Sequence, residues 1–179
     1  MAQPAHVYTL HLVRSVFNEE IFKLYQKYEI AIHNKNRTRS DFETFYCNSP
    51  LYDPENEPQK ADALALPSQK LIDPVWHGAD FGLVDQGVYP RALGSYFLLH
   101  RIDGKLVGVS SITIARRYME SSYFIYDTDY KHLNLGVVSV VREIEYIRLI
   151  QRKYNPQLQF YMLGDIVPTC PKVSYKMNY

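Results

Sequence analysis

Two aspartates lie close together in a polar turn, directly after an aromatic and β-branched run. Asp127 and Asp129 follow Tyr123-Phe124-Ile125-Tyr126, and Tyr130 comes next. Carboxylates placed in this way could hold an ammonium or a guanidinium group by charge-assisted hydrogen bonds, although a carboxylate is a poor base near neutral pH unless its pKa is raised. Aspartate is also favoured in turns on structural grounds alone. The pattern therefore indicates either a cation-binding site or a well-capped turn.

A long amphipathic helix is predicted directly after this turn. It begins near Leu135-Gly136, and apolar residues recur at helical spacing from Val137 to Ile150. Arg142 and Glu143 fall between the apolar positions, and Asn155-Pro156 ends the pattern because proline cannot continue a helix. The preceding run reads as a strand. Strand, acidic turn and helix together place polar side chains and free backbone N–H groups at one edge of a sheet, where a reaction centre could lie.

Strands and two shorter helices are predicted around this unit. Residues 6–16 alternate as a half-buried strand does. Asn18 is a candidate N-cap for a helix ending near His33, and Ser40-Asp41-Phe42-Glu43 has the pattern of a capping box for a short helix ending near Cys47. Further strands are expected at residues 95–102, 105–114, 121–126, 158–163 and 170–176, the first two joined by an Asp103-Gly104 hairpin turn. This order of strands and helices predicts an α/β (α+β) fold with a mixed sheet flanked by helices. It follows the element order of a GNAT-like acyltransferase fold.

The totals indicate a single globular domain over residues 1–179, with the proline-punctuated region 52–93 as an inserted loop. No run approaches the ~20 apolar residues that cross a membrane. Two cysteines are too few for a disulfide framework, so we expect a reducing compartment, the cytosol or the nucleus. The sequence does not define an oligomeric state, and a monomer is the favoured expectation. A net charge of +1 restricts nucleic-acid binding to local basic patches. The candidates, which a solvated surface would explain as well, are Lys35, Arg37, Arg39, Arg116 and Arg117.

Several segments resemble one family in a fixed order. They read LYQKYEIAIH, FETFYCNSPL, GSYFLLHRIDGKLVGVSSITI, SSYFIYDTDYKHLNLGVVSVVREIEYIR and FYMLG followed by CPKVSYK. From Ile21 to Tyr175, apart from region 52–93, these segments resemble the C-terminal catalytic domain of arginyl-tRNA–protein transferases. The resemblance implies a GNAT-like enzyme that moves arginine from arginyl-tRNA to the α-amino group of proteins with N-terminal Asp or Glu, marking them for degradation in the N-degron pathway. It implies no cofactor within this chain.

The resemblance also implies roles for particular residues. An amine attacking an activated ester needs positioning within ~3–3.5 Å and a stabilised oxyanion, but no enzymic nucleophile. The catalytic group carried over is Tyr126, Asp127, Asp129 and Tyr130, and the substrate-binding group is Asn134, Gly136, Lys172, Tyr175 and Cys47. Lys131, Asn134 and Gly136 fall where the acetyltransferase signature Q/R-x-x-G-x-G/A has its first, fourth and sixth residues, with asparagine in place of the first glycine. A coenzyme A pyrophosphate therefore fits this helix start poorly, and the tRNA 3′ end is a natural substitute. Plain helix initiation or packing is the alternative at each position.

Some family features are missing or changed. Phe97 and Leu98 stand where the family commonly has a histidine and a glutamine, Thr113 replaces an aspartate, and Ile166 and Pro168 take aromatic and histidine places. These changes leave either a retuned site or an inactive one. The family usually has an upstream cysteine-rich domain that holds a metal centre and usually continues past the CPK block. We therefore expect a fragment, a short gene product or an isolated catalytic domain, with no metal of its own.

Three functions compete on this basis. The leading one is the arginyltransferase catalytic domain. The alternatives are a catalytically impaired GNAT-like binding module and a coenzyme A-dependent N-acyltransferase.

Overall fold

A single five-stranded sheet forms the centre of the protein. The computed structural model describes residues 6–48, 94–153, 155–170 and 174–178, so the predicted insertion at 52–93 lies outside the described residues. The strand order is β1-β2-β3-β4-β5. The first four strands are antiparallel, and β5 runs parallel to β4. The strands are β1 (Tyr8–Arg14), β2 (Gly94–Ile102), β3 (Lys105–Ile114), β4 (Tyr118–Tyr126) and β5 (Phe160–Met162). The predicted mixed sheet is confirmed.

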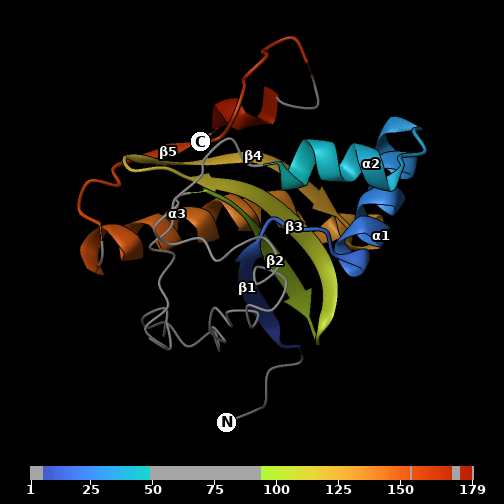
Figure 1. The fold of residues 1–179 in the computed structure, drawn as a ribbon, viewed down its shortest axis with the longest axis horizontal. Helices are drawn as coiled ribbons and strands as arrows, with labels where there is room; N and C mark the ends of the chain where they lie inside the picture. The colour runs from blue at the N-terminus through green and yellow to red at the C-terminus, as the bar shows by residue number, and fades with distance from the viewer. Residues whose placement is uncertain (1–5, 49–93, 154, 171–173, 179) are drawn as a thin grey trace.

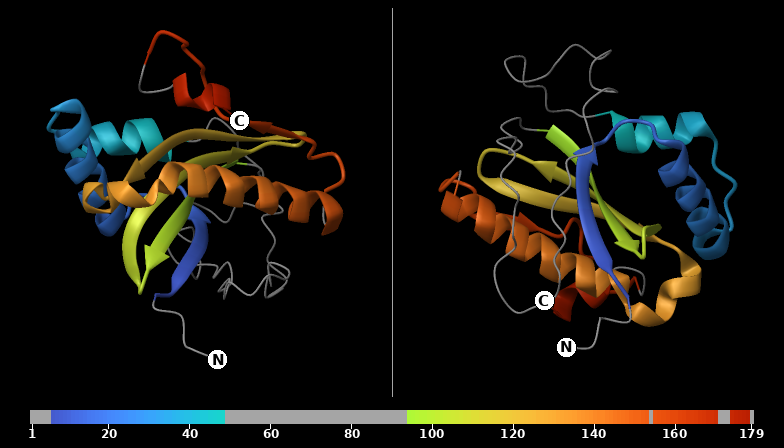
Figure 2. Two further views of the ribbon diagram at one scale, coloured as in Figure 1. Left: turned by 180° about the vertical axis from the view of Figure 1, so that it is seen from behind. Right: turned by 90° about the horizontal axis from the view of Figure 1, so that it is seen from below.

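Helices cover both faces of this sheet (Figures 1 and 2). Asn18 caps the first of them with its side chain, as predicted. On one face lie α1 (Glu19–Tyr28), its π-helical extension η1 (Glu29–His33), α2 (Arg39–Phe42) and its extension η2 (Glu43–Cys47). On the other lies α3 (Leu135–Lys153), which follows the 3₁₀ helix η3 (Thr128–Leu133), and a last 3₁₀ helix, η4, spans Ser174–Asn178.

Two apolar cores result, one on each face. The alternation of strand side chains sends Phe97 and Leu99 of β2 to the α1–α2 face and Tyr96 and Leu98 to the α3 face. The Asp103-Gly104 turn has positive φ at both residues, 50° and 82°, which matches the predicted two-residue hairpin between β2 and β3.

The connection from β4 through α3 to β5 leaves part of one strand edge open. Among the described residues, β5 pairs only with Tyr118–Glu120 of β4. The second half of β4, from Ser121 to Tyr126, therefore has a strand neighbour on the β3 side alone. Its polar backbone groups are not paired with another described strand there, although Gly164 passes close to the carbonyls of Ser121 and Ser122.

Three local predictions are wrong. The capping box joins Thr38 and Asp41 rather than Ser40 and Glu43. The helix starts two residues earlier than expected because Thr38 offers the same hydroxyl-to-carboxylate spacing, and Glu43 pairs with Arg39 one helical turn earlier.

The buried stripe of α3 also differs from the predicted one. Val137 and Val141 are 46% and 48% exposed, whereas Glu143 is 0% exposed and Arg142 is 9% exposed. The buried carboxylate of Glu143 has hydrogen-bond partners, which are described below. These partners make this orientation of α3 possible.

The third difference is at the C-terminal end. Residues 174–178 are a 3₁₀ helix where a strand over 170–176 was expected. The N–H of Ser174, at the start of this helix, donates to the carbonyl of Cys170. In addition, β4 begins at Tyr118, earlier than predicted, and β5 is limited to three residues.

Candidate functional site

The aspartate turn is a compact ionic cluster at the end of β4. Asp127 follows the strand directly, its backbone N–H donates to the carbonyl of Val107, and its side chain is 5% exposed. Lys27 of α1 donates to Oδ1 of Asp127 and, at 2.7 Å, to Oδ2 of Asp129. Lys105 of β3 lies 3.1 Å from Oδ2 of Asp127. One carboxylate thus joins α1, β3 and the start of η3.

The electrostatics separate the two aspartates. Burial alone would raise the pKa of Asp127, but hydrogen bonds from Lys27, the backbone N–H of Asp129 and Lys105 outweigh it and hold that pKa below its usual value. Asp127 is therefore an anion whose two oxygens are both occupied. The side chain of Asp129 is 68% exposed, and its Oδ1 has no hydrogen bond to a described residue. Asp129 alone is available to a further cation.

The other predicted catalytic residues border this cluster. Tyr130 lies under the Lys105 ammonium, with the nitrogen 4.8 Å from the ring centroid. Tyr126 packs edge to face on Tyr28, with 5.2 Å between ring centroids. The four residues predicted as catalytic are therefore brought together at the β4–η3 junction.

Asn134 and Gly136 lie at the start of α3, as predicted. Asn134 has a left-handed backbone, φ 50°, and its carbonyl accepts from the N–H groups of Val137 and Val138. These contacts account for helix initiation, and a substrate role for either residue stays a prediction.

Cys47, Lys172 and Tyr175 are not joined to this cluster by any described contact. Cys47 packs against the α1–α2 core, and burial raises the pKa of its thiol to about 11, so it is not a thiolate at neutral pH. Lys172 and the side chain of Tyr175 lie outside the described residues. Their substrate-binding roles stay predictions.

The basic residues predicted for tRNA fall into two separate groups. Arg37 and Arg39 are each paired with a carboxylate, Glu29 and Glu43, while Lys35 is exposed. Binding of tRNA by this loop stays a prediction.

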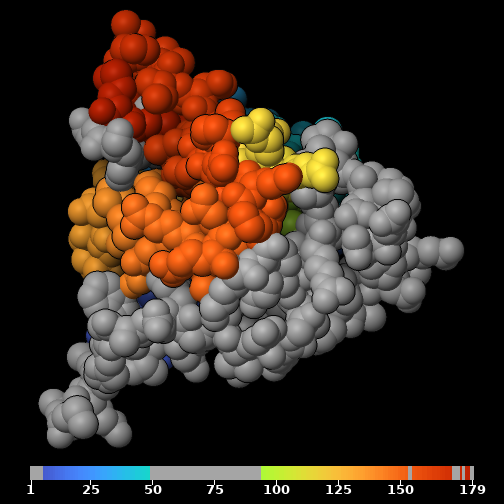
Figure 3. Space-filling view, turned by 90° about the vertical axis from the view of Figure 1, so that its left-hand side faces the viewer, coloured from blue at the N-terminus to red at the C-terminus, as the bar shows by residue number. Residues whose placement is uncertain are grey.

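The second basic group is the exposed turn between β3 and β4. Arg116 and Arg117 form this turn, which is yellow in Figure 3 and lies beside the loop that follows α3. Asn155 and Gln159 of that loop donate to the carbonyls of Arg116 and Arg117. The turn is nine residues of β4, ~30 Å, from the aspartate cluster. The two predicted sites lie at opposite ends of one strand.

The positions that differ from the family pattern do not form one surface. Phe97 is 1% exposed within the α1–α2 core. Thr113 faces Ser95 across the β2–β3 ladder, with 3.4 Å between their hydroxyl oxygens. Ile166 is half exposed, and Pro168 is exposed.

Sequence reasoning missed a buried polar chain on the α3 face. The Tyr8 hydroxyl lies 2.5 Å from Nδ1 of His100, Nε2 of His100 lies 3.1 Å from the Ser139 hydroxyl, and Ser139 donates to Oε1 of Glu143 at 2.6 Å. Tyr161 of β5 donates to Oε2 of Glu143 at 2.7 Å. The chain joins β1, β2, α3 and β5. Glu143 and Ser139 are four residues apart. This spacing indicates that they share a face of the helix, but it does not indicate that the face is buried.

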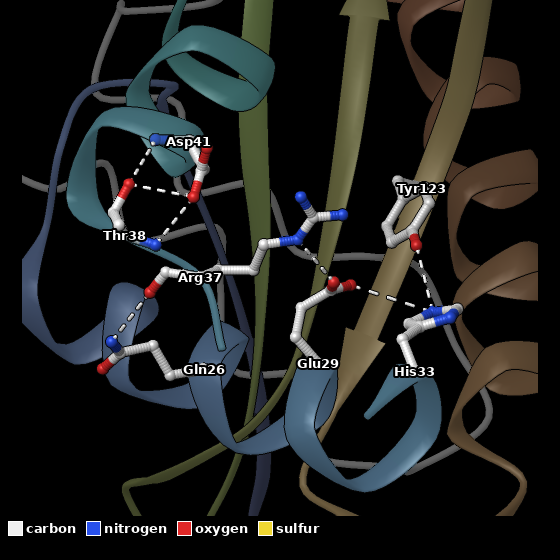
Figure 4. Close-up of polar contacts among 7 residues, drawn as sticks. All are labelled: Gln26, Glu29, His33, Arg37, Thr38, Asp41 and Tyr123. Carbon is white, nitrogen blue, oxygen red and sulfur yellow. Dashed lines mark hydrogen bonds and ion pairs between the residues drawn. The ribbon is translucent and has the colours of Figure 1, made fainter. Parts of the chain in front are cut away.

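A second missed cluster lies where η1 passes over β4 (Figure 4). Glu29, which is 3% exposed, accepts a hydrogen bond from Nε of Arg37, and His33 and Tyr123 lie beside it. A π-helical turn often marks a functional site, but the sequence shows no clear pattern that predicts a π-helical turn.

No group of three or more histidine, cysteine or acidic side chains suited to a metal ion occurs among the described residues. Within the same residues, no helix has the length and apolar character to cross a membrane.

The fold and the open edge define a class. A mixed sheet with a β4–α3–β5 crossover, a partly unpaired β4 and a polar turn before α3 is a GNAT-like acyltransferase fold. Residues 20–179 match the family described as "Arginine-tRNA-protein transferase, C terminus", and the chain belongs to that family.

Relatives with curated names agree with this assignment. Arginyl-tRNA–protein transferase 1 of Arabidopsis thaliana is 31% identical over 173 residues, which are 95% of this chain and 23% of the relative. The Dictyostelium discoideum enzyme of the same name is 27% identical, over 99% of this chain and 36% of the relative. An aspartate/glutamate leucyltransferase of Campylobacter jejuni is 37% identical over 84 residues, 47% of this chain and 33% of the relative. The chain thus spans about a third or less of the length of these relatives.

Proposed function

We propose that this chain carries the acyl-transfer step of an arginyl-tRNA–protein transferase. The observation that supports it most is the open half of β4, which ends at the Asp127–Asp129 cluster within a domain of that family. The α-amine of an acceptor protein attacks the ester carbonyl of the aminoacyl-tRNA. The carbon–oxygen ester bond then breaks, and the tRNA ribose oxygen leaves with a proton as the new amide forms.

The two aspartates have different tasks in this proposal. Asp129 binds the cationic group of a substrate, the guanidinium of the arginyl group or the ammonium of the acceptor, through its exposed carboxylate. Asp127 positions Asp129, because it accepts the Asp129 backbone N–H at 3.1 Å and shares Lys27 with it. The name of the Campylobacter relative supports an acceptor that begins with Asp or Glu. The two unpaired cysteines are compatible with the cytoplasm or the nucleus, where we propose that the protein acts as a monomer.

Transfer of labelled arginine from arginyl-tRNA to a peptide that begins with aspartate tests the function. The wild-type chain, with the upstream domain of a relative supplied in trans, is compared with Asp129→Asn and Asp127→Asn. We expect each variant to lose at least about tenfold in rate, which corresponds to ~1.4 kcal/mol of activation free energy. Unchanged turnover in both variants would show that the aspartates only shape the turn.

Further arms of the assay separate the other functions. Leucyl-tRNA as donor tests the activity named for the Campylobacter relative. If a folded wild-type chain transfers neither amino acid, the binding-module alternative holds. If instead it binds acetyl coenzyme A at micromolar concentration, the coenzyme A-dependent alternative holds.

A further inference from the structure

The cluster around Glu29 holds an arginine in a fixed orientation. Glu29 lies on η1, and its side chain is 4% exposed. Its Oε2 accepts from Nε of Arg37 at 3.0 Å, and its Oε1 lies 3.8 Å from Nε2 of His33. Tyr123 of β4 completes the group, with its hydroxyl 3.3 Å from the same His33 nitrogen (Figure 4). The guanidinium is therefore anchored by a buried carboxylate next to β4.

The backbone of Arg37 is fixed as well. Its carbonyl accepts a hydrogen bond from the Gln26 side chain at 3.1 Å. The next residue, Thr38, is the N-cap of α2 and exchanges hydrogen bonds with Asp41. The backbone and the Nε of Arg37 are thus held, which lowers the entropic cost of using the side chain to bind a ligand.

The outer end of this guanidinium has no partner among the described residues. Nη1 and Nη2 of Arg37 make no hydrogen bond there, and neither nitrogen carries a dashed line in Figure 4. The side chain is 34% exposed. Two terminal guanidinium nitrogens form the fork that binds a carboxylate through two parallel N–H···O bonds.

Aromatic side chains connect this fork to the open edge of β4. Phe45 of η2, which is 65% exposed, packs edge to face on Tyr123 with 5.7 Å between ring centroids. On the other side, Tyr28 contacts both His33 and Tyr126, at 5.7 and 5.2 Å. The fork therefore lies on the α1–α2 face of the sheet, near Tyr123 of β4.

We propose that Arg37 binds the side-chain carboxylate of the acceptor's N-terminal residue and so sets a preference for acidic N-termini, with Glu29 as its positioning residue. This inference rests on the proposed function and concerns only the choice of acceptor. A carboxylate is favoured over a tRNA phosphate because Glu29 offsets the long-range field of Arg37, whereas the two terminal N–H groups still form short-range hydrogen bonds with a carboxylate. Phosphate binding depends on uncompensated cations, whereas a fixed fork beside aromatic side chains recognises by geometry.

Two peptides that differ only in an N-terminal Asp or Asn provide the test, because these residues have the same shape and differ in charge. The ratio of their kcat/KM values is measured for wild type, Arg37→Lys and the double variant Arg37→Gln/Glu29→Gln, which avoids leaving a buried carboxylate unpaired. We expect the ratio to fall by about tenfold or more in both variants, the loss of a charge-assisted pair. The rate with the Asn peptide is the uncharged reference for each variant, and the KM for tRNA is measured beside it.

Lys23→Gln is the matched control, since Lys23 is an exposed cation of α1 whose only partner among the described residues is Glu19, at 3.6 Å. It should leave the ratio unchanged. An equal loss with both peptides, a higher KM for tRNA and a weaker salt dependence would overturn the proposal in favour of a tRNA phosphate contact. An unchanged ratio in both Arg37 variants would also overturn it.

Peptide binding without transfer separates this inference from the proposed function. If wild type transfers to neither peptide, calorimetric titration of the two peptides still applies. A preference for the Asp peptide that Arg37→Lys abolishes would support the acceptor site, and equal binding of both peptides by wild type would refute it.

Discussion

Ser139→Ala should be one of the most destabilising small substitutions in the protein, because Ser139 links two buried ionisable side chains. Glu143 accepts from Ser139 and from Tyr161. The single Ser139 proton is thus given to Glu143, so the Ser139 oxygen must accept from Nε2–H of His100. Nδ1 of His100 is then unprotonated and accepts from the Tyr8 hydroxyl. Every hydrogen bond in this buried set of side chains therefore has a fixed direction.

The magnitude follows from what the alanine leaves behind. His100 and Glu143 are both 0% exposed and Ser139 is 2% exposed, so water does not replace the lost hydroxyl. Two buried polar groups without a partner cost about 1–3 kcal/mol each. Alanine returns about 0.5 kcal/mol because it favours a helix more than serine does. The net loss is about 1.5–5.5 kcal/mol, a large share of the ~5–15 kcal/mol that stabilises a typical domain.

Urea unfolding at pH 7 measures this loss as a shift in midpoint at constant slope. Ser122→Ala is the control, because Ser122 is exposed on β4 and should change stability by no more than about 0.5 kcal/mol. A double-mutant cycle with Glu143→Gln should show coupling of about 0.5–3 kcal/mol. If Ser139→Ala is as stable as the control, the hydrogen-bond chain does not exist in solution as described.

Three further predictions concern the pH dependence and packing of the same fold. Burial lowers the pKa of His100 from 6.5 to about 3, so the unfolded chain binds one more proton below pH 6.5, and stability should fall by about 1.4 kcal/mol per unit between about pH 6 and 4. Urea midpoints across this range should show a shallower slope for His100→Gln; an identical slope would contradict the assignment. Burial would raise the pKa of Asp127, but its hydrogen bonds, chiefly from Lys27, hold it below 3.8. The contribution of Asp127 to the free energy of unfolding is therefore complete above about pH 4 and is lost as the pH falls through the folded pKa. The difference in stability between Asp127→Asn and wild type, measured by urea unfolding, should therefore shrink on acidification rather than stay constant. Finally, Gly108→Ala places a Cβ 2.8 Å from Cζ of Phe124 and should cost about 1–3 kcal/mol with a changed near-ultraviolet circular dichroism spectrum, whereas an unaltered spectrum and midpoint would mean that the ring moves freely.

The sequence predicted the elements whose signals are local. The hairpin at Asp103-Gly104, the Asn18 cap and the extent of α3 depend on a few adjacent residues, and all are confirmed. The prediction was less accurate where two local patterns compete. Thr38 and Ser40 both precede an acidic residue by three positions, and the structure caps the helix with Thr38 while Glu43 pairs with Arg39.

The site was predictable only in part, because burial of charge depends on partners that are distant in sequence. The aspartate turn was correctly located, but the two lysines that pair with Asp127 come from α1 and β3, 100 and 22 residues away. Glu143 was expected among solvent-facing residues because nothing near it in sequence shows that a histidine of β2 and a tyrosine of β5 will lie beside it.

Two features explain why part of the β4 edge is open: a bulge in its pairing with β3 and the path of the chain after β5. The β3–β4 register shifts between Ser111 and Ile112, which lie opposite the start of the unpaired half of β4, and such a bulge increases twist and bends the strand. On the β5 side, Gly164 follows the strand and has a φ of 65°. It passes so close to β4 that a Cβ on Gly164 would lie 3.5 Å from the Ser121 carbonyl oxygen. The parallel pairing therefore ends where β4 bends away, and the edge left free runs from this point to the aspartate cluster. The same geometry that limits β5 to three residues thus leaves the second half of β4 without a parallel partner among the described strands, up to the strand end that Asp127 and Asp129 follow.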